Sequence, residues 1–221
     1  MYPVCLDIRD KLCVVVGGGE VALRKVQGLL AARARIRVIS PEVEPELDLL
    51  AGQGKIDWRR KAYAPDDIAQ ALLVFAATDD RATQQLVCRQ AARDGQLVNV
   101  ADDPACCNFQ VPATFRRGDL TIAVATGGKS PAVAAMIRGK LEGEFGPEYE
   151  LLLNLMALVR RQVVAGSHSQ AERKNIYKKI LHDDIVEWIR RGKVDLVRAH
   201  LQSVLGPEME VDINALNLDI A

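Results

Sequence analysis

The sequence predicts an α/β fold, in which a doubly wound parallel sheet is followed by a β-hairpin with a helix and then by a small all-helical domain. Two observations carry this prediction. Apolar, β-branched runs alternate with amphipathic helical patterns as far as Ala101, and this alternation is typical of parallel strands joined by crossover helices. From Pro147 onward, every candidate element has a helical period.

The elements of the first part follow one another as strand, helix and strand. The apolar run KLCVVV at 11–16 predicts a buried strand, and residues 20–32 predict an amphipathic helix. The inner face of this helix consists of Val21, Val26, Leu29 and Leu30. The later elements are strands at 36–40, 55–63, 71–78 and 96–101 and helices at 44–50 and 82–92. Ligands of such a sheet bind at the carboxyl ends of its strands.

The pattern changes after the fifth predicted strand. Residues 109–126 contain two extended runs joined by RRGD, which predicts an antiparallel hairpin. Ser130 as a cap and Pro131 at the first helical position predict a helix that closes near Gly146. The helices that follow have breaks near 165–169, 182–184 and 190–193, and the segment from Pro207 has no clear period and is expected to be loosely held. These changes divide the chain into domains at 1–113, 114–146 and 147–221.

Composition and charge narrow the class of protein. Apolar residues make up 49% and charged residues 26% of the 221 residues, and the formal net charge is zero. This composition is that of a soluble globular protein, and it provides no overall field that attracts nucleic acid or an anionic membrane. The N-terminus has no basic region before a long apolar core, and no apolar run reaches the roughly 18 residues of a membrane helix. We therefore expect a cytoplasmic protein with no nucleic-acid or membrane partner.

The cysteines give little sign of a metal site. They are five in number, an odd count, and show no C-x-x-C spacing: Cys5, Cys13, Cys88, Cys106 and Cys107. In a cytosolic chain we expect reduced thiols. Because Cys106 and Cys107 are adjacent, both can hardly bind one metal ion, and no metal site is expected.

A glycine-rich turn follows the first predicted strand, in VVVGGGEVALRK. Gly17, Gly19 and Ala22 fit the spacing G-x-G-x-x-G/A, with Gly18 between the first two. In this motif the first glycine permits the sharp turn, the second leaves room for a pyrophosphate, and the third small residue lets the helix lie close to the sheet. Since the motif also opens a predicted helix, whose free N–H groups bind phosphate, it predicts dinucleotide binding in a Rossmann-like domain. The alternative is a purely structural turn.

The end of the second predicted strand indicates which dinucleotide binds. The usual acidic residue is not cleanly present there, because the chain reads Ser40, Pro41, Glu42. Either Ser40 or Glu42 can meet the ribose, which favours NAD over NADP, although Arg35 and Arg37 are nearby in sequence.

Two more polar loops follow strands of the predicted sheet. Thr78 and Asp79 come just after one strand and Asp102 just after the next, beside the predicted cofactor cleft. We expect Thr78 and Asp79 to contact the cofactor. A single aspartate in such a place can be a solvated loop residue or a strand-end cap. Two loops that open on one crevice favour a functional role for at least one carboxylate.

Taken together, these segments resemble a known family. They are similar to the precorrin-2 dehydrogenase and sirohydrochlorin ferrochelatase enzymes of siroheme synthesis, including the N-terminal module of larger siroheme synthases. Matching segments occur in family order between residues 2 and 145, and the C-terminal helices match only in length and character. The segments are VVGGGEVALRK, ISPE, FAATDD, VNVADDP, F-x-x-PA, RGDLTIAVATGGKSP and IRGKLE.

The resemblance implies an activity and an assembly. It implies NAD-dependent oxidation of precorrin-2 to sirohydrochlorin, in many members also Fe²⁺ insertion to give siroheme, and a homodimer with the hairpin and the following helix at its interface. Carried over to this sequence, the cofactor contacts are Glu20, Val21, Pro41 and Glu42. Asp102 matches the aspartate that is essential for both activities.

The chemistry of the residues agrees with this implication. Forming the aromatic macrocycle removes a hydride, which the nicotinamide accepts, and a proton, which a base must take. Because no histidine precedes His168, Asp102 is the expected base or proton relay, and it can also take pyrrole protons as Fe²⁺ enters. The polycarboxylate substrate calls for cations and N–H donors. The candidates are Arg116, Gly127, Gly128, Lys129, Ser130 and Arg138.

Two positions depart from the family pattern, and two rival functions stay open. Thr126 stands where some relatives have a phosphorylatable serine, and Arg33 stands where the family usually has a glycine that ends the first helix. The first rival is dehydrogenase activity without chelatase activity. The second is a non-enzymatic, NAD-sensing regulatory module, which the glycine turn and the sheet alone would also fit.

Overall fold

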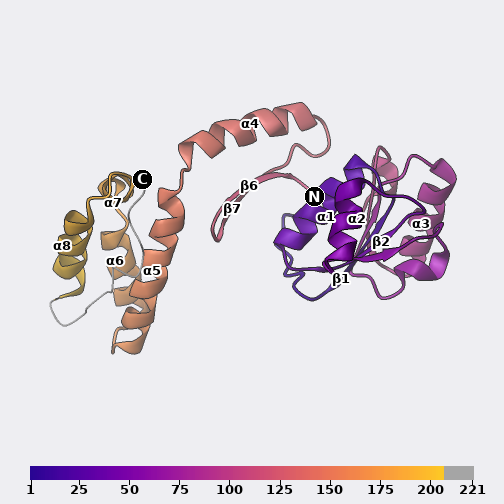
Figure 1. Ribbon diagram of the computed structural model, residues 1–221. Helices are drawn as coiled ribbons and strands as arrows, with labels where there is room; N and C mark the ends of the chain where they lie inside the picture. The colour runs from indigo at the N-terminus through magenta and orange to yellow at the C-terminus, as the bar shows by residue number, and fades with distance from the viewer. Residues whose placement is uncertain (207–221) are drawn as a thin grey trace. The chain divides into compact units, whose positions relative to one another are not determined.

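The computed structural model describes residues 1–206 and divides the chain into two compact units (Figure 1). The first unit comprises Met1–Val111, and the second begins at Pro112. The prediction for the segment from Pro207 lies outside the described residues. The division of the second unit into a dimerisation region and a helical domain stays a prediction.

The first unit is built on a five-stranded parallel sheet, which confirms the predicted fold class. The strands are β1 (Leu12–Val16), β2 (Arg35–Ile39), β3 (Asp57–Arg59), β4 (Leu73–Ala76) and β5 (Leu97–Val100), in the spatial order β3-β2-β1-β4-β5. All four strand pairs are parallel. Two of the three inner strands, β1 and β4, are almost wholly buried, as expected for a sheet covered on both faces.

Helices cover both faces of this sheet (Figure 1). Helices α1 (Glu20–Ala31) and α2 (Pro45–Gly52) pack on one face, and α3 (Arg81–Arg93) packs on the other with the short 3₁₀ helix η1 (Pro65–Ile68). Alternate strand residues supply the two cores, so that Val15 faces α1 while Val14 faces α3. Of the inner face predicted for α1, Val26 and Leu29 are buried, and Val21 and Leu30 are partly buried and pack against the same core.

The ends of two helices follow local rules. Asp80 caps α3, because its carboxylate accepts hydrogen bonds from the backbone N–H groups of Ala82 and Thr83. Just beyond α1, Arg33 has a φ of +57°, the left-handed region that favours glycine. The position where the resembled family usually has glycine therefore does require an unusual backbone here, and arginine adopts it.

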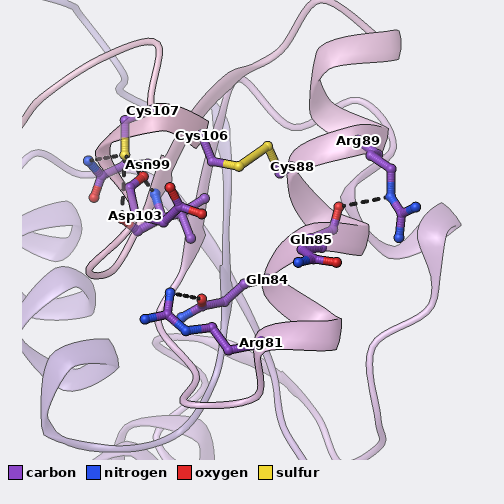
Figure 2. Close-up of a disulfide and its surroundings, with 10 residues drawn as sticks. Arg81, Gln84, Gln85, Cys88, Arg89, Asn99, Asp103, Cys106 and Cys107 are labelled. Atoms are coloured by element: carbon purple, nitrogen blue, oxygen red, sulfur yellow. Dashed lines mark hydrogen bonds between the residues drawn. A yellow bond between two sulfur atoms is a disulfide. The ribbon is translucent and has the colours of Figure 1, made fainter.

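The cysteines correct one expectation. Cys88 on α3 and Cys106 on the 3₁₀ helix η2 (Pro104–Cys106) form a disulfide, with their Cα atoms 5.8 Å apart (Figure 2). The expectation of five reduced thiols is therefore wrong for this pair. The chain after β5 folds back against α3 and brings two distant cysteines within the span of a disulfide. Cys5, Cys13 and Cys107 are free.

The second unit contains the predicted hairpin and helices. Strands β6 (Ala113–Arg117) and β7 (Leu120–Val124) are antiparallel, and α4 (Pro131–Glu144) begins where Ser130 accepts a hydrogen bond from the N–H of Val133. Helices α5 (Glu148–Ala165), α6 (Gln170–Ile180), α7 (Asp183–Arg190) and α8 (Val194–Leu205) share one apolar core. The breaks between them fall at the predicted places. In residues 1–206, no helix has the length and apolar character needed to cross a membrane.

Candidate functional site

The candidate site lies at the carboxyl ends of the strands in the first unit. Because the strands are parallel, the loops that follow β1, β2, β4 and β5 leave the same edge of the sheet. The chain builds outward from β1 on one side and from β4 on the other, so the strand order reverses between these two neighbours. Ligands of open parallel sheets bind at such a switch point. The structure brings the predicted cofactor residues and Asp102 to this edge.

The turn after β1 is shaped by close backbone contacts. The N–H of Gly17 donates to the carbonyl oxygen of Ile39 at 2.9 Å, and its φ is +122°. A Cβ on Gly17 would overlap the carbonyl oxygen of Ala77, and one on Gly18 would overlap the carbonyl oxygen of Glu42. Both positions therefore require glycine, since the turn is pressed against the loops that follow β2 and β4.

Gly19 differs from its two neighbours. It is the N-cap of α1 with a φ of −85°, and a Cβ placed there would find no atom within 4 Å in the described part of the chain. No described side chain caps the helix at this position, so the first N–H groups of α1 keep their hydrogen-bonding capacity. Open space in front of a free helix N-terminus is the arrangement that binds phosphate. The turn therefore fits the pyrophosphate of a dinucleotide.

The loop after β2 presents one carboxylate. The hydroxyl of Ser40 donates to the carbonyl oxygen of Glu42 at 2.6 Å, and the indole N–H of Trp58 donates to the carbonyl oxygen of Ser40 at 2.9 Å. Ser40 thus holds the loop together, while Glu42 is exposed and its backbone carbonyl lies beside Gly18. Of the two predicted ribose contacts, Glu42 is the one with a free side chain in the described residues. Pro41 is also exposed.

The loops after β4 and β5 carry the remaining predicted residues. The hydroxyl of Thr78 accepts from the N–H of Asp80 at 3.3 Å, and Asp79 is exposed. Asp102 is exposed as well, with a φ of +58°, and its carboxylate has no hydrogen-bond partner among residues 1–206. It is therefore available to a ligand at this edge, and it is not a strand-end cap.

Two further residues near these loops were not singled out from the sequence. Lys25 of α1 is half-buried, with its Nζ 5.5 Å from the centroid of the Phe75 ring. Its burial, and secondly the charge of Arg24, lower the pKa of the Lys25 ammonium. Gln84 of α3 is buried and bonded to two of the loops. Lys25 could have been found from the sequence, because it lies three residues after Ala22 and so on the same, buried face of α1.

The predicted substrate residues belong to the second unit. Gly127, Gly128 and Lys129 form an exposed turn ahead of α4, in which the Thr126 hydroxyl donates to the carbonyl oxygen of Ser130 at 3.0 Å. Arg138 is paired with Glu142 on the same helix at 2.6 Å, which offsets its charge. Arg116 is exposed on β6. The first unit by itself thus contains the predicted cofactor residues and Asp102, and the second contains the candidate cations.

The parallel sheet, its switch point and the glycine turn define a Rossmann-like protein with a turn that fits a dinucleotide. A family model described as putative NAD(P)-binding matches residues 4–113, and one described as sirohaem biosynthesis protein central matches residues 117–144. The chain belongs to the precorrin-2 dehydrogenase and siroheme synthase family, as the sequence resemblance implied.

Individual relatives agree with this assignment. The chain is 35% identical over 212 residues to a siroheme synthase of Nitrosospira multiformis, covering 94% of this chain and 45% of that protein. It is 37% identical over 182 residues to siroheme synthase 1 of Aeromonas salmonicida, covering 82% of this chain and 39% of that one. The chain therefore spans less than half the length of these relatives.

A solved structure matches over nearly the whole chain. The structure described as SirC, precorrin-2 dehydrogenase, superposes with a TM-score of 0.77 at 28% identity, covering 93% of this chain and 99% of that one. These similarities support an oxidoreductase with a nicotinamide cofactor. In the part of the chain that the structure describes, no group of three or more His, Cys, Asp or Glu side chains could hold a metal ion.

Proposed function

We propose that the chain is an NAD-dependent dehydrogenase that oxidises precorrin-2 to sirohydrochlorin, and that it acts as a cytoplasmic homodimer. The observation that carries the proposal is the N-terminus of α1 at Gly19, which no side chain of residues 1–206 caps, at the same sheet edge as the Asp102 carboxylate, which has no partner among those residues. The helix N-terminus suits the phosphates of a dinucleotide, and the carboxylate can serve as a proton acceptor. The family assignment supplies the substrate.

The exposed carboxylate of Glu42 supports NAD as the dinucleotide. A carboxylate at the end of the second strand accepts hydrogen bonds from the ribose hydroxyls and repels a 2′-phosphate. The two arginines nearby in sequence do not offset it. Arg37 is paired with Asp57 at 2.9 Å, and Arg35 begins β2 at the opposite edge of the sheet, about 13 Å along the strand from its carboxyl end. We expect Glu20 and Val21 to lie against the bound cofactor, at the first turn of α1.

The reaction transfers a hydride and a proton from precorrin-2. The nicotinamide, when bound, supplies the hydride acceptor. Asp102 takes the proton, because its carboxylate is exposed and has no partner in the described residues, and because no histidine lies in the first unit. The overall reaction converts precorrin-2 and NAD⁺ to sirohydrochlorin, NADH and a proton.

The second unit provides the features expected of a substrate and dimer region. Lys129 and the turn at Gly127 and Gly128 precede the N-terminus of α4, which favours a carboxylate of the substrate. Val133 and Met136 lie three residues apart on α4 with 42% and 54% of their surface exposed. An apolar face of this kind supports self-association through the hairpin and α4.

Iron insertion is a second candidate activity. It rests on the same carboxylate, since the exposed Asp102 can accept the two pyrrole protons one after the other, passing each to solvent, as Fe²⁺, a substrate here, enters sirohydrochlorin. It is tested separately, by supplying sirohydrochlorin and Fe²⁺ without NAD⁺. Formation of siroheme establishes the activity, and its absence leaves a dehydrogenase.

The proposal is tested by incubating the protein with precorrin-2 and NAD⁺ while following NADH and the tetrapyrrole spectrum. Asp102→Asn is expected to lower kcat by at least roughly 100-fold, the usual contribution of a general base, with the Kd for NAD⁺ unchanged. Asp103→Asn is the matched control, since it removes the neighbouring carboxylate, and is expected to change kcat little. Wild-type kcat in Asp102→Asn would contradict the mechanism. Binding of NAD⁺ without turnover by the wild type would favour an NAD-sensing module.

A further inference from the structure

Gln84 is a buried polar side chain beside the candidate site. It lies in the first turn of α3 with 5% of its surface exposed. A buried amide must find hydrogen-bond partners for its N–H₂ group and its oxygen, because each unpaired group loses its bonds to water. The partners of Gln84 therefore show what this residue holds together.

The amide joins two loops of the site. Its Nε2 donates to the carbonyl oxygen of Thr78 at 2.6 Å and to that of Ala101 at 3.3 Å. Its Oε1 accepts from Nη1 of Arg81 at 3.1 Å, at the start of α3 (Figure 2). Thr78 follows β4 and Ala101 follows β5, so one side chain links the loops that carry Asp79 and Asp102.

The hydrogen bonds of Gln84 lie just past the last paired residues of β4 and β5. The backbone pairing of β4 and β5 closes with the N–H of Ala101 donating to the carbonyl oxygen of Ala76 at 2.9 Å. The next group along the chain is the peptide between Ala101 and Asp102, and Gln84 bonds its carbonyl oxygen. Asp102 then adopts a φ of +58°. A left-handed aspartate is uncommon and persists only where its surroundings hold it.

We infer that Gln84 is a positioning residue, which orients the peptide ahead of Asp102 and thereby directs the carboxylate that takes the substrate proton. The inference rests on the proposed function. It concerns orientation before cofactor affinity, because the phosphate-binding turn at Gly17–Gly19 is held by its own contacts with Ile39 and by the loops after β2 and β4. The bond to Thr78 also holds the loop of the predicted cofactor contacts Thr78 and Asp79, so a smaller effect on NAD⁺ binding accompanies it. A catalytic group displaced by about an ångström can lose on the order of 100-fold in rate.

The chain offers a matched control in Gln96. This glutamine is also buried, 9% exposed, and its Nε2 also donates to two carbonyl oxygens, of Ile68 at 2.6 Å and Ala71 at 3.0 Å. Gln96 precedes β5 and Ala71 precedes β4, so its bonds lie at the amino ends of the strands, away from the site. Gln84→Met and Gln96→Met thus remove the same kind of double hydrogen bond at opposite edges of one sheet.

The test compares both variants in the full chain with precorrin-2 and NAD⁺. We expect both to lower the melting temperature, and only Gln84→Met to lower kcat, by roughly 10-fold to 100-fold, with a smaller change in the Kd for NAD⁺. Adding Gln84→Met to Asp102→Asn should lower kcat little further, because two residues that act through one group are not additive. A merely structural role would instead give additive losses.

A milder variant keeps the test decisive if Gln84→Met does not fold. Arg81 is exposed, so Arg81→Met removes the bond to Oε1 without opening the core, and a smaller loss of kcat is expected at unchanged stability. Equal kcat values for the Gln84 and Gln96 variants, additive losses in the double variant, or an unchanged kcat in Arg81→Met would each overturn the role of Gln84. These outcomes presuppose an active wild type. A wild type that binds NAD⁺ without oxidising precorrin-2 overturns the proposed function as well, so the two failures are distinguishable.

Discussion

Replacing Gly19 by alanine separates the two roles that a glycine-rich turn can have, a tight bend or a phosphate cradle. A Cβ at Gly19 would meet no described atom within 4 Å, and its φ of −85° suits any residue. The only structural cost is that alanine caps a helix less well than glycine, roughly 0.5–1 kcal/mol. We expect the added methyl group, however, to enter the open space that the pyrophosphate would occupy at the start of α1.

We therefore expect Gly19→Ala to fold and to bind NAD⁺ poorly. A loss of 10-fold to 100-fold in Kd corresponds to about 1.4–2.8 kcal/mol and would exceed the structural cost. Gly17→Ala should have the opposite effect, with a larger loss of stability than of NAD⁺ affinity. Its Cβ overlaps the Ala77 carbonyl oxygen at a φ of +122°, and the strained backbone alone costs about 1–3 kcal/mol, before the overlap is counted.

Two measurements on each variant decide the matter. Urea unfolding gives the free energy of unfolding, and calorimetric titration gives the Kd for NAD⁺. Gly19→Ala should change mainly the Kd, and Gly17→Ala mainly the stability. If Gly19→Ala bound NAD⁺ as tightly as the wild type, the turn would be a bend alone and the cradle argument would be refuted.

Two further predictions concern the links that hold each unit together. The Cys88–Cys106 disulfide closes a segment of 18 residues, so Cys88→Ala should lower the free energy of unfolding by about 3 kcal/mol in the chain-entropy model. Thiol labelling of the denatured protein should detect three free cysteines before reduction and five after it. Five free cysteines before reduction would exclude the disulfide. Burial acts to raise the pKa of the Glu148 carboxyl, but hydrogen bonds from Arg190 and from the N–H of Gly146 outweigh it and hold the pKa below its ordinary value of 4.5. Its stabilisation is thus complete above that value and lost as the pH falls through the lower, folded-state pKa. Glu148→Gln should therefore cost about 1.5–3 kcal/mol at pH 7, and the difference from the wild type in urea midpoint should shrink on acidification; a difference that is independent of pH would contradict this account.

Local patterns in the sequence were enough to predict much of the fold. The run Leu12–Val16 is apolar at every position and so predicts a strand buried on both faces, and Ser130 with Pro131 marks the start of α4. These signals are local, because hydrophobic period and cap chemistry depend on residues within one or two turns of each other. The glycine spacing after β1 belongs to the same class, and it was enough to predict a dinucleotide site.

The tertiary structure decided what depends on residues distant in the chain. The requirement for glycine at Gly18 comes from the carbonyl oxygen of Glu42, on another loop, and the disulfide joins Cys88 to a segment that folds back only after β5. Gln84 looks like any polar residue on the first turn of a helix until β4 and β5 bring two carbonyl oxygens to its amide. Packing of parallel strands creates these contacts, and no local pattern encodes which distant backbone atom a side chain will meet.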